Sequence, residues 1–331
     1  MGKSVQSLYK KIEAALKDGC LPPDFSLPES TDSGIQFADG ARDGILLYHM
    51  NLPRLSDADR SAMEKGISQS SEHRWEEAEA VLMPVLEKYR TLGVIDEMQS
   101  WIMNHARDLN AENLFLFGMK QLQEADETEM VKLGLSILEL FDTEEEEDLK
   151  RMVRTVGRSD EFTLFAVFIM KKWKNADREI FDLAKSVTGW GRIHALERLE
   201  AEDEEIRRWI LMEGVRNDIL PSYSALAAWR KSGAEEVLRL GPDASEFAAI
   251  KRIISALMDE GPMPGLSALE NREEIIRRFL FHAGNYAMTA EDCDIIRELR
   301  SRFIENEEIR LQCDGLLEKP ASEEASLKEA E

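Results

Sequence analysis

Cysteine is scarce in this chain of 331 residues, and its scarcity excludes two common architectures. The three cysteines, Cys20, Cys293 and Cys313, are too few and too widely spaced for a disulfide framework or a metal-binding knuckle. Cys293 shares an apolar stripe with Ile296, and Cys313 shares one with Ile309. We therefore expect both thiols to be buried and to pack as small hydrophobic groups.

Long hydrophobic runs are also missing. The longest, residues 164–170, is far shorter than the roughly 20 residues that span a bilayer. The first 19 residues lack the apolar core of a signal peptide and predict a short amphipathic helix, so we expect a cytoplasmic protein. The net charge of -23 opposes binding to phosphate backbones and anionic membranes. We expect neither a membrane nor a nucleic acid as the partner.

Recognisable catalytic motifs are absent too. The sequence contains no HExxH, Glu-x-x-His, GxGxxG, GxxxxGK[ST] or GxSxG pattern. The histidines are isolated from one another: His49, His73, His105, His194 and His282. We therefore predict no catalytic residue, no metal ligand and no cofactor, and we favour a non-enzymatic protein.

Short polar residues at near-constant spacing are the strongest pattern that is present. They lie 16 or 17 positions apart, and each precedes a helix-forming segment: Asn110, Asp126, Thr143, Ser159 and Asn175. Side chains of this kind cap exposed N–H groups at helix N-termini. Glu146 follows Thr143 at the spacing of a capping box. The pattern predicts a repeating array of helices.

Two consecutive helices of this array span about 33 residues, which is typical of stacked helical hairpins. Over residues 75–230, and with weaker rhythm to residue 317, the chain resembles the HEAT and armadillo class of α-solenoids. The resemblance implies an all-α fold in which HEAT-like hairpins form a right-handed superhelix. The alternative is a globular all-α bundle, which even helix spacing disfavours.

We predict three segments: an N-terminal helix and cap or loop in residues 1–55, the repeat domain in residues 56–317, and a disordered acidic tail in residues 318–331. Asp39-Gly40 and Asp43-Gly44 favour turns, so residues 35–49 predict a short hairpin or an ordered loop. This segment either covers the end of the array or forms a binding loop. Pro84 predicts a bend in the helix over residues 75–90.

Charge is unevenly distributed along the chain. Residues 150–232 contain 16 Lys and Arg against 13 Asp and Glu, a net charge of +3, whereas residues 144–148 are all acidic. The basic residues either belong to ordinary solvated helix faces or line a groove that accepts an acidic partner.

The most site-like segment is GWGRIHALER, where the helix rhythm breaks. On a helix, Trp190, His194 and Arg198 follow one another at one-turn intervals. We predict a contact surface formed by Trp190, Arg192, His194, Arg198 and Arg208. His194 is either an acid–base or anion-binding group, or a structural histidine held by the neighbouring repeat.

Two further resemblances suggest other functions. The segments GWGRIHALERLE, DEEIRRWIL and FADGARDGILLYHM are similar to a group of bacterial proteins that often carry the name limonene hydroxylase, which implies a haem, flavin or non-haem iron cofactor. DNA alkylation-repair glycosylases are similar at the level of the HEAT-like fold and bind DNA in a basic groove. Our leading hypothesis is a binding module that holds a protein or peptide on a concave face. The alternatives are a nucleic-acid-binding repeat protein and a small-molecule enzyme.

Overall fold

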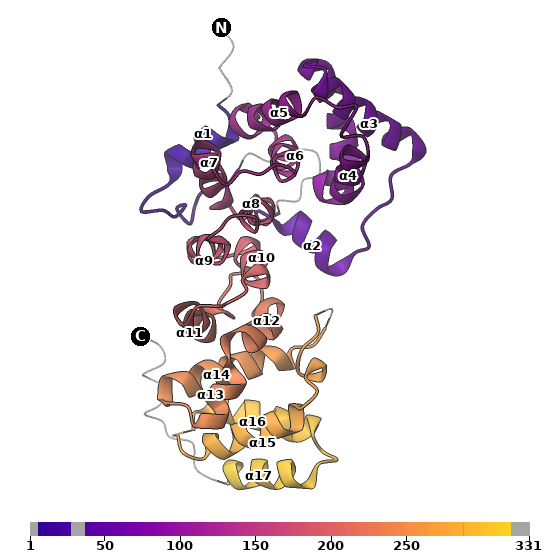
Figure 1. The fold of residues 1–331 in the computed structure, drawn as a ribbon. Coiled ribbons are helices and arrows are strands. Elements are labelled where there is room, and N and C mark those ends of the chain that lie inside the picture. Colours follow the sequence, from indigo (N-terminus) through magenta and orange to yellow (C-terminus); the bar gives the residue numbers. More distant parts are fainter. Residues whose placement is uncertain (1–5, 28–36, 262, 287, 319–331) are drawn as a thin grey trace. The chain divides into compact units, whose positions relative to one another are not determined.

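The computed structural model describes residues 6–27, 37–261, 263–286 and 288–318, and these residues are predominantly helical (Figure 1). Within these ranges the chain forms 17 α-helices, one short 3-10 helix and no β-strand. The prediction of an all-α fold is therefore confirmed. Residues 319–331, which make up nearly all of the predicted tail, lie outside the described ranges.

The chain divides into two compact units, residues 1–199 and residues 200–331. The first unit contains α1 (Leu8–Ala15), α2 (Ala41–His49), α3 (Asp57–Ser71), α4 (Trp75–Asn104), α5 (Ala111–Glu124), α6 (Thr128–Leu138), α7 (Glu147–Gly157), α8 (Thr163–Met170), α9 (Ala176–Ser186) and α10 (Trp190–Arg198).

Helices of the first unit pack in a regular order. Consecutive helices pair as α3 with α4, α5 with α6, α7 with α8, and α9 with α10. In one row α4 contacts α6, α6 contacts α8, and α8 contacts α10. In the other row α3 contacts α5, and α5 contacts α7. The two rows bury a continuous apolar core that includes Met63, Leu82, Phe117, Leu133 and Ile137. Burial of each such side chain contributes about 1.5–3 kcal/mol to folding.

The second unit contains α11 (Glu204–Glu213), α12 (Ser222–Ser232), α13 (Ala234–Leu240), α14 (Ala244–Met258), the 3-10 helix η1 (Leu266–Ala268), α15 (Arg272–Ala283), α16 (Ala290–Arg302) and α17 (Glu307–Leu317). Here α12 packs on α11, α13 and α14, and α17 packs on both α15 and α16. Cys293 and Cys313 are buried in this unit, as predicted, and burial raises the pKa of the Cys313 thiol to about 11.

The evenly spaced polar residues fall between successive helices from α4 to α9, so their spacing identified the helix boundaries correctly. Two of them occupy N-cap positions, Asn110 for α5 and Asn175 for α9. Only Asn110 caps with its side chain, whose oxygen accepts a hydrogen bond from the N–H of Asn113 at 3.0 Å.

The other three predicted caps are wrong. Asp126 lies two residues before the start of α6, and Ser159 begins a turn that precedes α8. Thr143 is buried, and its hydroxyl accepts a hydrogen bond from the indole N–H of Trp173 at 2.9 Å. It does not form the predicted capping box with Glu146, because Glu146 is itself the N-cap residue of α7. The Thr143 side chain instead bonds to Trp173, which lies 30 residues later, and the spacing of polar residues does not predict this contact.

Helix α4 is interrupted at Arg90 and not at Pro84. Arg90 has φ 60° and ψ 157°, so the backbone leaves the helical region there, between the two segments that we predicted for residues 75–90 and 94–109. A non-glycine residue with positive φ is strained by about 1–3 kcal/mol and persists only where its surroundings hold it. The contacts of the Arg90 side chain provide that hold, as described below.

Residues 41–49 form helix α2, so the predicted hairpin or loop is wrong. The turn signal is nevertheless partly correct, because Gly40 has φ 76° and starts the helix from a left-handed conformation that favours glycine. Side chains of α2 contact α4, α6 and α10, and α1 packs against α5 and α7. Helices α1 and α2 therefore each contact several helices of the two rows and do not merely cover one end of them.

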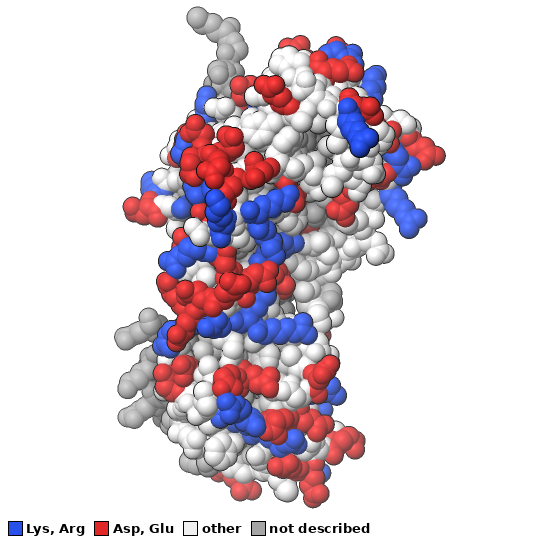
Figure 2. Space-filling model, viewed as in Figure 1, with Lys and Arg blue, Asp and Glu red and all other residues white. Residues whose placement is uncertain are grey.

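Basic side chains of residues 150–232 are largely engaged with carboxylates. Lys150 contacts Glu144 at 3.2 Å, Arg154 contacts Glu179 at 2.7 Å, and Lys174 contacts Glu145 at 3.3 Å. Figure 2 shows positive and negative side chains intermingled over the face drawn. These pairs favour ordinary helix faces over a basic groove, since the acidic run at residues 144–148 neutralises part of the excess charge.

Candidate functional site

Trp190 and His194, two members of the predicted contact surface, lie in the core. They are 4% and 1% exposed, respectively. The ring of Tyr48, on α2, stacks on both, with centroid distances of 5.9 Å to Trp190 and 5.8 Å to His194. The backbone of α2 approaches the indole so closely at Gly44 that a β-carbon there would overlap the ring. These two residues hold α2 in place and present no surface to a partner, so this part of the prediction is wrong.

His194 is neutral in this environment. Burial, with a smaller contribution from the positive charge of Arg198, lowers the pKa of its imidazole to about 3. Its Nδ1 lies 3.4 Å from the hydroxyl of Tyr48, and its Nε2 has no hydrogen-bond partner among the described residues. The guanidinium of Arg198 donates a hydrogen bond to the carbonyl of His194 and covers the ring of Phe168, with 5.1 Å from its central carbon to the ring centroid. This arrangement suits a structural histidine.

The remaining two predicted residues belong to different units. Arg192 is partly exposed on α10 in the first unit. Arg208 is exposed on α11 in the second unit and lies 3.4 Å from Glu246. The structure therefore brings Trp190, His194 and Arg198 together, but the first two are buried and cannot belong to an exposed contact surface.

Five charged side chains instead gather inside the first unit, and we call them the ion cluster. They are Asp43 of α2, Arg90 of α4, Glu129 and Lys132 of α6, and Glu161 of the turn before α8. Lys132 is fully buried and contacts Asp43, Glu161 at 2.5 Å and Glu129 at 3.4 Å. Arg90 contacts Asp43 and Glu129 at 2.8 Å each and Glu161 at 3.3 Å. Each cation is shared by the same three carboxylates.

The ion cluster keeps its charges despite burial. Burial alone would lower the pKa of Lys132, but the three carboxylates raise it above its ordinary value. Burial alone would raise the pKa of Asp43, but Lys132 and Arg90 lower it. A buried pair is worth little compared with an apolar pair, whereas removal of one partner costs about 3–5 kcal/mol. The cluster therefore fixes which helices meet here.

Backbone hydrogen bonds complete the ion cluster. The N–H of Gly40 donates to Glu161 at 2.5 Å, and the N–H of Thr91 donates to Glu129 at 2.6 Å. The break in α4 releases the N–H of Thr91 for this contact, since it directly follows Arg90. The strained backbone at Arg90 is thus found where the Arg90 side chain binds three carboxylates and the N–H of Thr91 binds Glu129.

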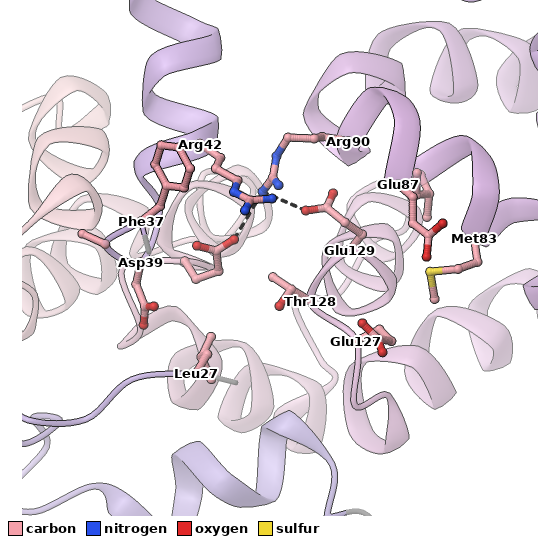
Figure 3. A pocket seen from close by; sticks show the side chains of 13 residues that line it. Leu27, Phe37, Asp39, Arg42, Met83, Glu87, Arg90, Glu127, Thr128 and Glu129 are labelled. Carbon is pink, nitrogen blue, oxygen red and sulfur yellow. Dashed lines mark hydrogen bonds and ion pairs between the residues drawn. The ribbon is translucent and has the colours of Figure 1, made fainter. Parts of the chain in front are cut away.

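A cavity of about 350 Å³ opens beside the ion cluster (Figure 3). Its apolar lining comes from Leu27, Phe37, Ala38, Met83 and Leu86. Its charged lining comprises five carboxylates and two guanidiniums: Asp39, Glu87, Glu127, Glu129, Glu161, Arg42 and Arg90. Figure 3 shows Glu87 and Glu127 across the cavity from Phe37 and Asp39. With all these groups ionised, the lining has an excess of negative charge.

Two carboxyl groups of the cavity have raised pKa values. Burial, and then repulsion by Glu161 and Asp160, raises the pKa of Asp39 to about 6. Partial desolvation, together with repulsion by Asp126 and Glu87, raises the pKa of Glu127. Carboxylates that repel one another in a partly desolvated cavity form a site at which an added cation is stabilised.

The carboxylates of the ion cluster do not form a metal centre. Among the residues that the structure describes, no group of three or more His, Cys, Asp or Glu side chains is arranged to hold a metal ion. Lys132 and Arg90 occupy the space between the carboxylates. None of the described helices combines the length and the apolar character needed to cross a membrane.

Comparison with known proteins gives no further assignment, because no protein-family model, curated protein or solved structure matches this chain. Sequence reasoning missed the cavity as well. Two signals pointed toward it: the paired Asp-Gly steps at residues 39–44, and a lysine, Lys132, inside the otherwise apolar stretch of α6.

Proposed function

We propose that this protein is a non-enzymatic binding module whose cavity accepts the positively charged side chain of a protein or peptide partner. The excess of carboxylates over guanidiniums in the cavity lining carries the proposal. A lysine or arginine side chain has an apolar stem and a cationic end, and the lining offers surfaces for both. The net charge of -23 would attract such a partner from a distance.

The order of the helices supports the same class of function. The two rows of the first unit agree with a HEAT-like α-solenoid, which remains our proposal for the fold. Repeat arrays of this kind use extended concave surfaces to bind chains. The binding site lies in the first unit and is formed by α2, α4 and α6 with the segments before α2 and α8, in place of the predicted surface around His194.

The acidic lining is the opposite of what a phosphate-binding groove needs, so the proposal favours a basic peptide over a nucleic acid. We therefore still propose a protein or peptide as the partner, and we now propose that a positively charged side chain of it enters the cavity.

A pair of matched peptides tests the proposal by isothermal titration calorimetry. One peptide contains a single arginine flanked by glycine and serine, and the other contains citrulline, the neutral isostere, at the same position. We expect the arginine peptide to bind at least tenfold more tightly, which corresponds to about 1.4 kcal/mol. Equal binding of the two peptides, or no binding of either, would overturn the proposal.

A charge-matched pair of variants locates the site. Glu87 and Glu127 are exposed at the cavity, so Glu87→Gln/Glu127→Gln should fold normally and should bind the arginine peptide about tenfold more weakly. Glu76→Gln/Glu112→Gln changes the net charge by the same amount at exposed positions outside the cavity lining and should bind like the unaltered protein. Equal losses in both variants would show a non-specific charge effect.

A further inference from the structure

Arg42 differs from the other cations near the cavity. Arg90 and Lys132 are each shared by three carboxylates, whereas Arg42 makes no ion pair with any residue that the structure describes. Its guanidinium covers the ring of Phe37, with 5.0 Å from the central carbon to the ring centroid. Figure 3 shows Arg42 and Phe37 on the same side of the cavity.

A guanidinium held against an aromatic ring keeps the donors at its edge available for hydrogen bonds. Its planar fork matches a carboxylate, which accepts two parallel N–H bonds from it. The lining therefore offers two chemically different regions: carboxylates for a cation, and one guanidinium for an anion. A purely anionic ligand is disfavoured, because the carboxylates outnumber the guanidiniums.

We propose that the cavity recognises the C-terminal residue of a peptide chain ending in arginine or lysine, with Arg42 binding the terminal carboxylate and the acidic lining binding the basic side chain. This proposal rests on the proposed function and makes its partner specific. A C-terminal basic residue is the simplest part of a polypeptide that carries a cation and a carboxylate together. An internal arginine offers only the cation and leaves Arg42 without an anion.

The test compares two peptides that end in the same arginine, one with a free carboxylate and one with a C-terminal amide. Calorimetric titration of the unaltered protein should show about tenfold tighter binding of the acid. Non-specific electrostatics predict the reverse, because a protein with a net charge of -23 attracts the more positive amide. A preference for the amide, or equal binding of both, would overturn the role of Arg42.

Variants of Arg42 should change the binding of the peptide acid and the peptide amide differently, which a purely structural role of Arg42 would not produce. Arg42→Gln should weaken binding of the acid about tenfold and leave the amide unchanged or bound more tightly, because one repelling cation is lost. Arg42→Lys should restore part of the preference, since a lysine keeps the charge without the fork. Arg54→Gln, at an exposed position outside the cavity lining, should behave like the unaltered protein.

The outcomes separate this inference from the function on which it rests. Binding of both arginine peptides with equal affinity, together with rejection of the citrulline peptide, overturns the inference and leaves the proposed function standing. Binding of neither peptide overturns both. Free arginine binding more tightly than the peptide acid would overturn the assignment to a chain terminus. A parallel loss of acid and amide binding in Arg42→Gln would assign Arg42 a structural role and overturn the inference.

Discussion

Asp39 gives the sharpest test of the cavity, because its carboxyl group ionises at neutral pH in a place that disfavours the charge. Its pKa rises from 3.8 to about 6 through burial and through repulsion by Glu161 and Asp160. A folded-state pKa above the unfolded value means that the native protein binds the proton more tightly. The contribution of Asp39 to stability is therefore favourable below pH 4, declines as the pH rises toward 6, and is lost above that pH.

The expected magnitude follows from the pKa difference. A difference of about 2 pH units corresponds to about 3 kcal/mol, and partial contact with water reduces this to about 1–2 kcal/mol. Asp39→Asn removes the charge and keeps an oxygen that can accept the hydrogen bond from the backbone of Leu27. We expect the variant to be more stable than the unaltered protein by this amount at pH 7.5 and equally stable near pH 4.

Urea denaturation followed by circular dichroism at the two pH values measures the effect. The same variant should bind the arginine peptide more weakly at pH 7.5, so that one substitution raises stability and lowers affinity. Asp24→Asn, at an exposed position outside the cavity lining, is the control and should change neither quantity. The reasoning would be refuted if Asp39→Asn were no more stable than the unaltered protein at pH 7.5. It would also be refuted if the variant were stabilised by the same amount at both pH values.

Three further predictions concern the core around the cavity. Lys132→Met should lower the free energy of unfolding by about 3–5 kcal/mol in urea denaturation, because Asp43 stays buried with one cation fewer, and adding Asp43→Asn should recover part of the loss. Gly44→Ala should destabilise by about 1–3 kcal/mol and alter the near-ultraviolet circular dichroism of Trp190, because the added methyl group overlaps the indole; an unchanged spectrum would contradict the packing. The neutral, buried His194, with a pKa of about 3, contributes less to stability as the pH drops below 6.5, by about 2 kcal/mol at pH 5. Urea denaturation should therefore show that the unaltered protein loses about this much stability relative to His194→Gln between pH 7.5 and pH 5; an unchanged difference would contradict the neutral state of the imidazole.

Local sequence pattern predicted the helical part of the fold well. Apolar periodicity and the spacing of polar residues located the boundaries between α4 and α9, because these depend on neighbours within one or two turns. It failed where a side chain serves a distant partner. Thr143 has the chemistry of a cap, but Trp173 takes its hydroxyl. His194 lies at the border of an apolar stripe, yet Tyr48, nearly 150 positions earlier, covers it.

The cavity could not be predicted from the sequence for the same reason. Its ion cluster joins Asp43 to Glu161 through a lysine and an arginine from two other helices. Nothing in the local pattern assigns a partner to any of these charges. The lysine in α6 does carry a signal in retrospect, because a lone cation among apolar helix positions requires a buried anion from elsewhere in the chain.

Helix α2 has only nine residues, and three of them have separate tasks at different angles around its axis. Arg42 lines the cavity, Asp43 enters the ion cluster, and Tyr48 lies one turn beyond Gly44 against the aromatic stack. Successive residues of a helix are turned by about 100° around its axis. One residue inserted between Asp43 and Tyr48 would therefore rotate Tyr48 away from its partners while Arg42 and Asp43 kept theirs. The spacing between Asp43 and Tyr48 is therefore fixed by the contacts on both sides of it.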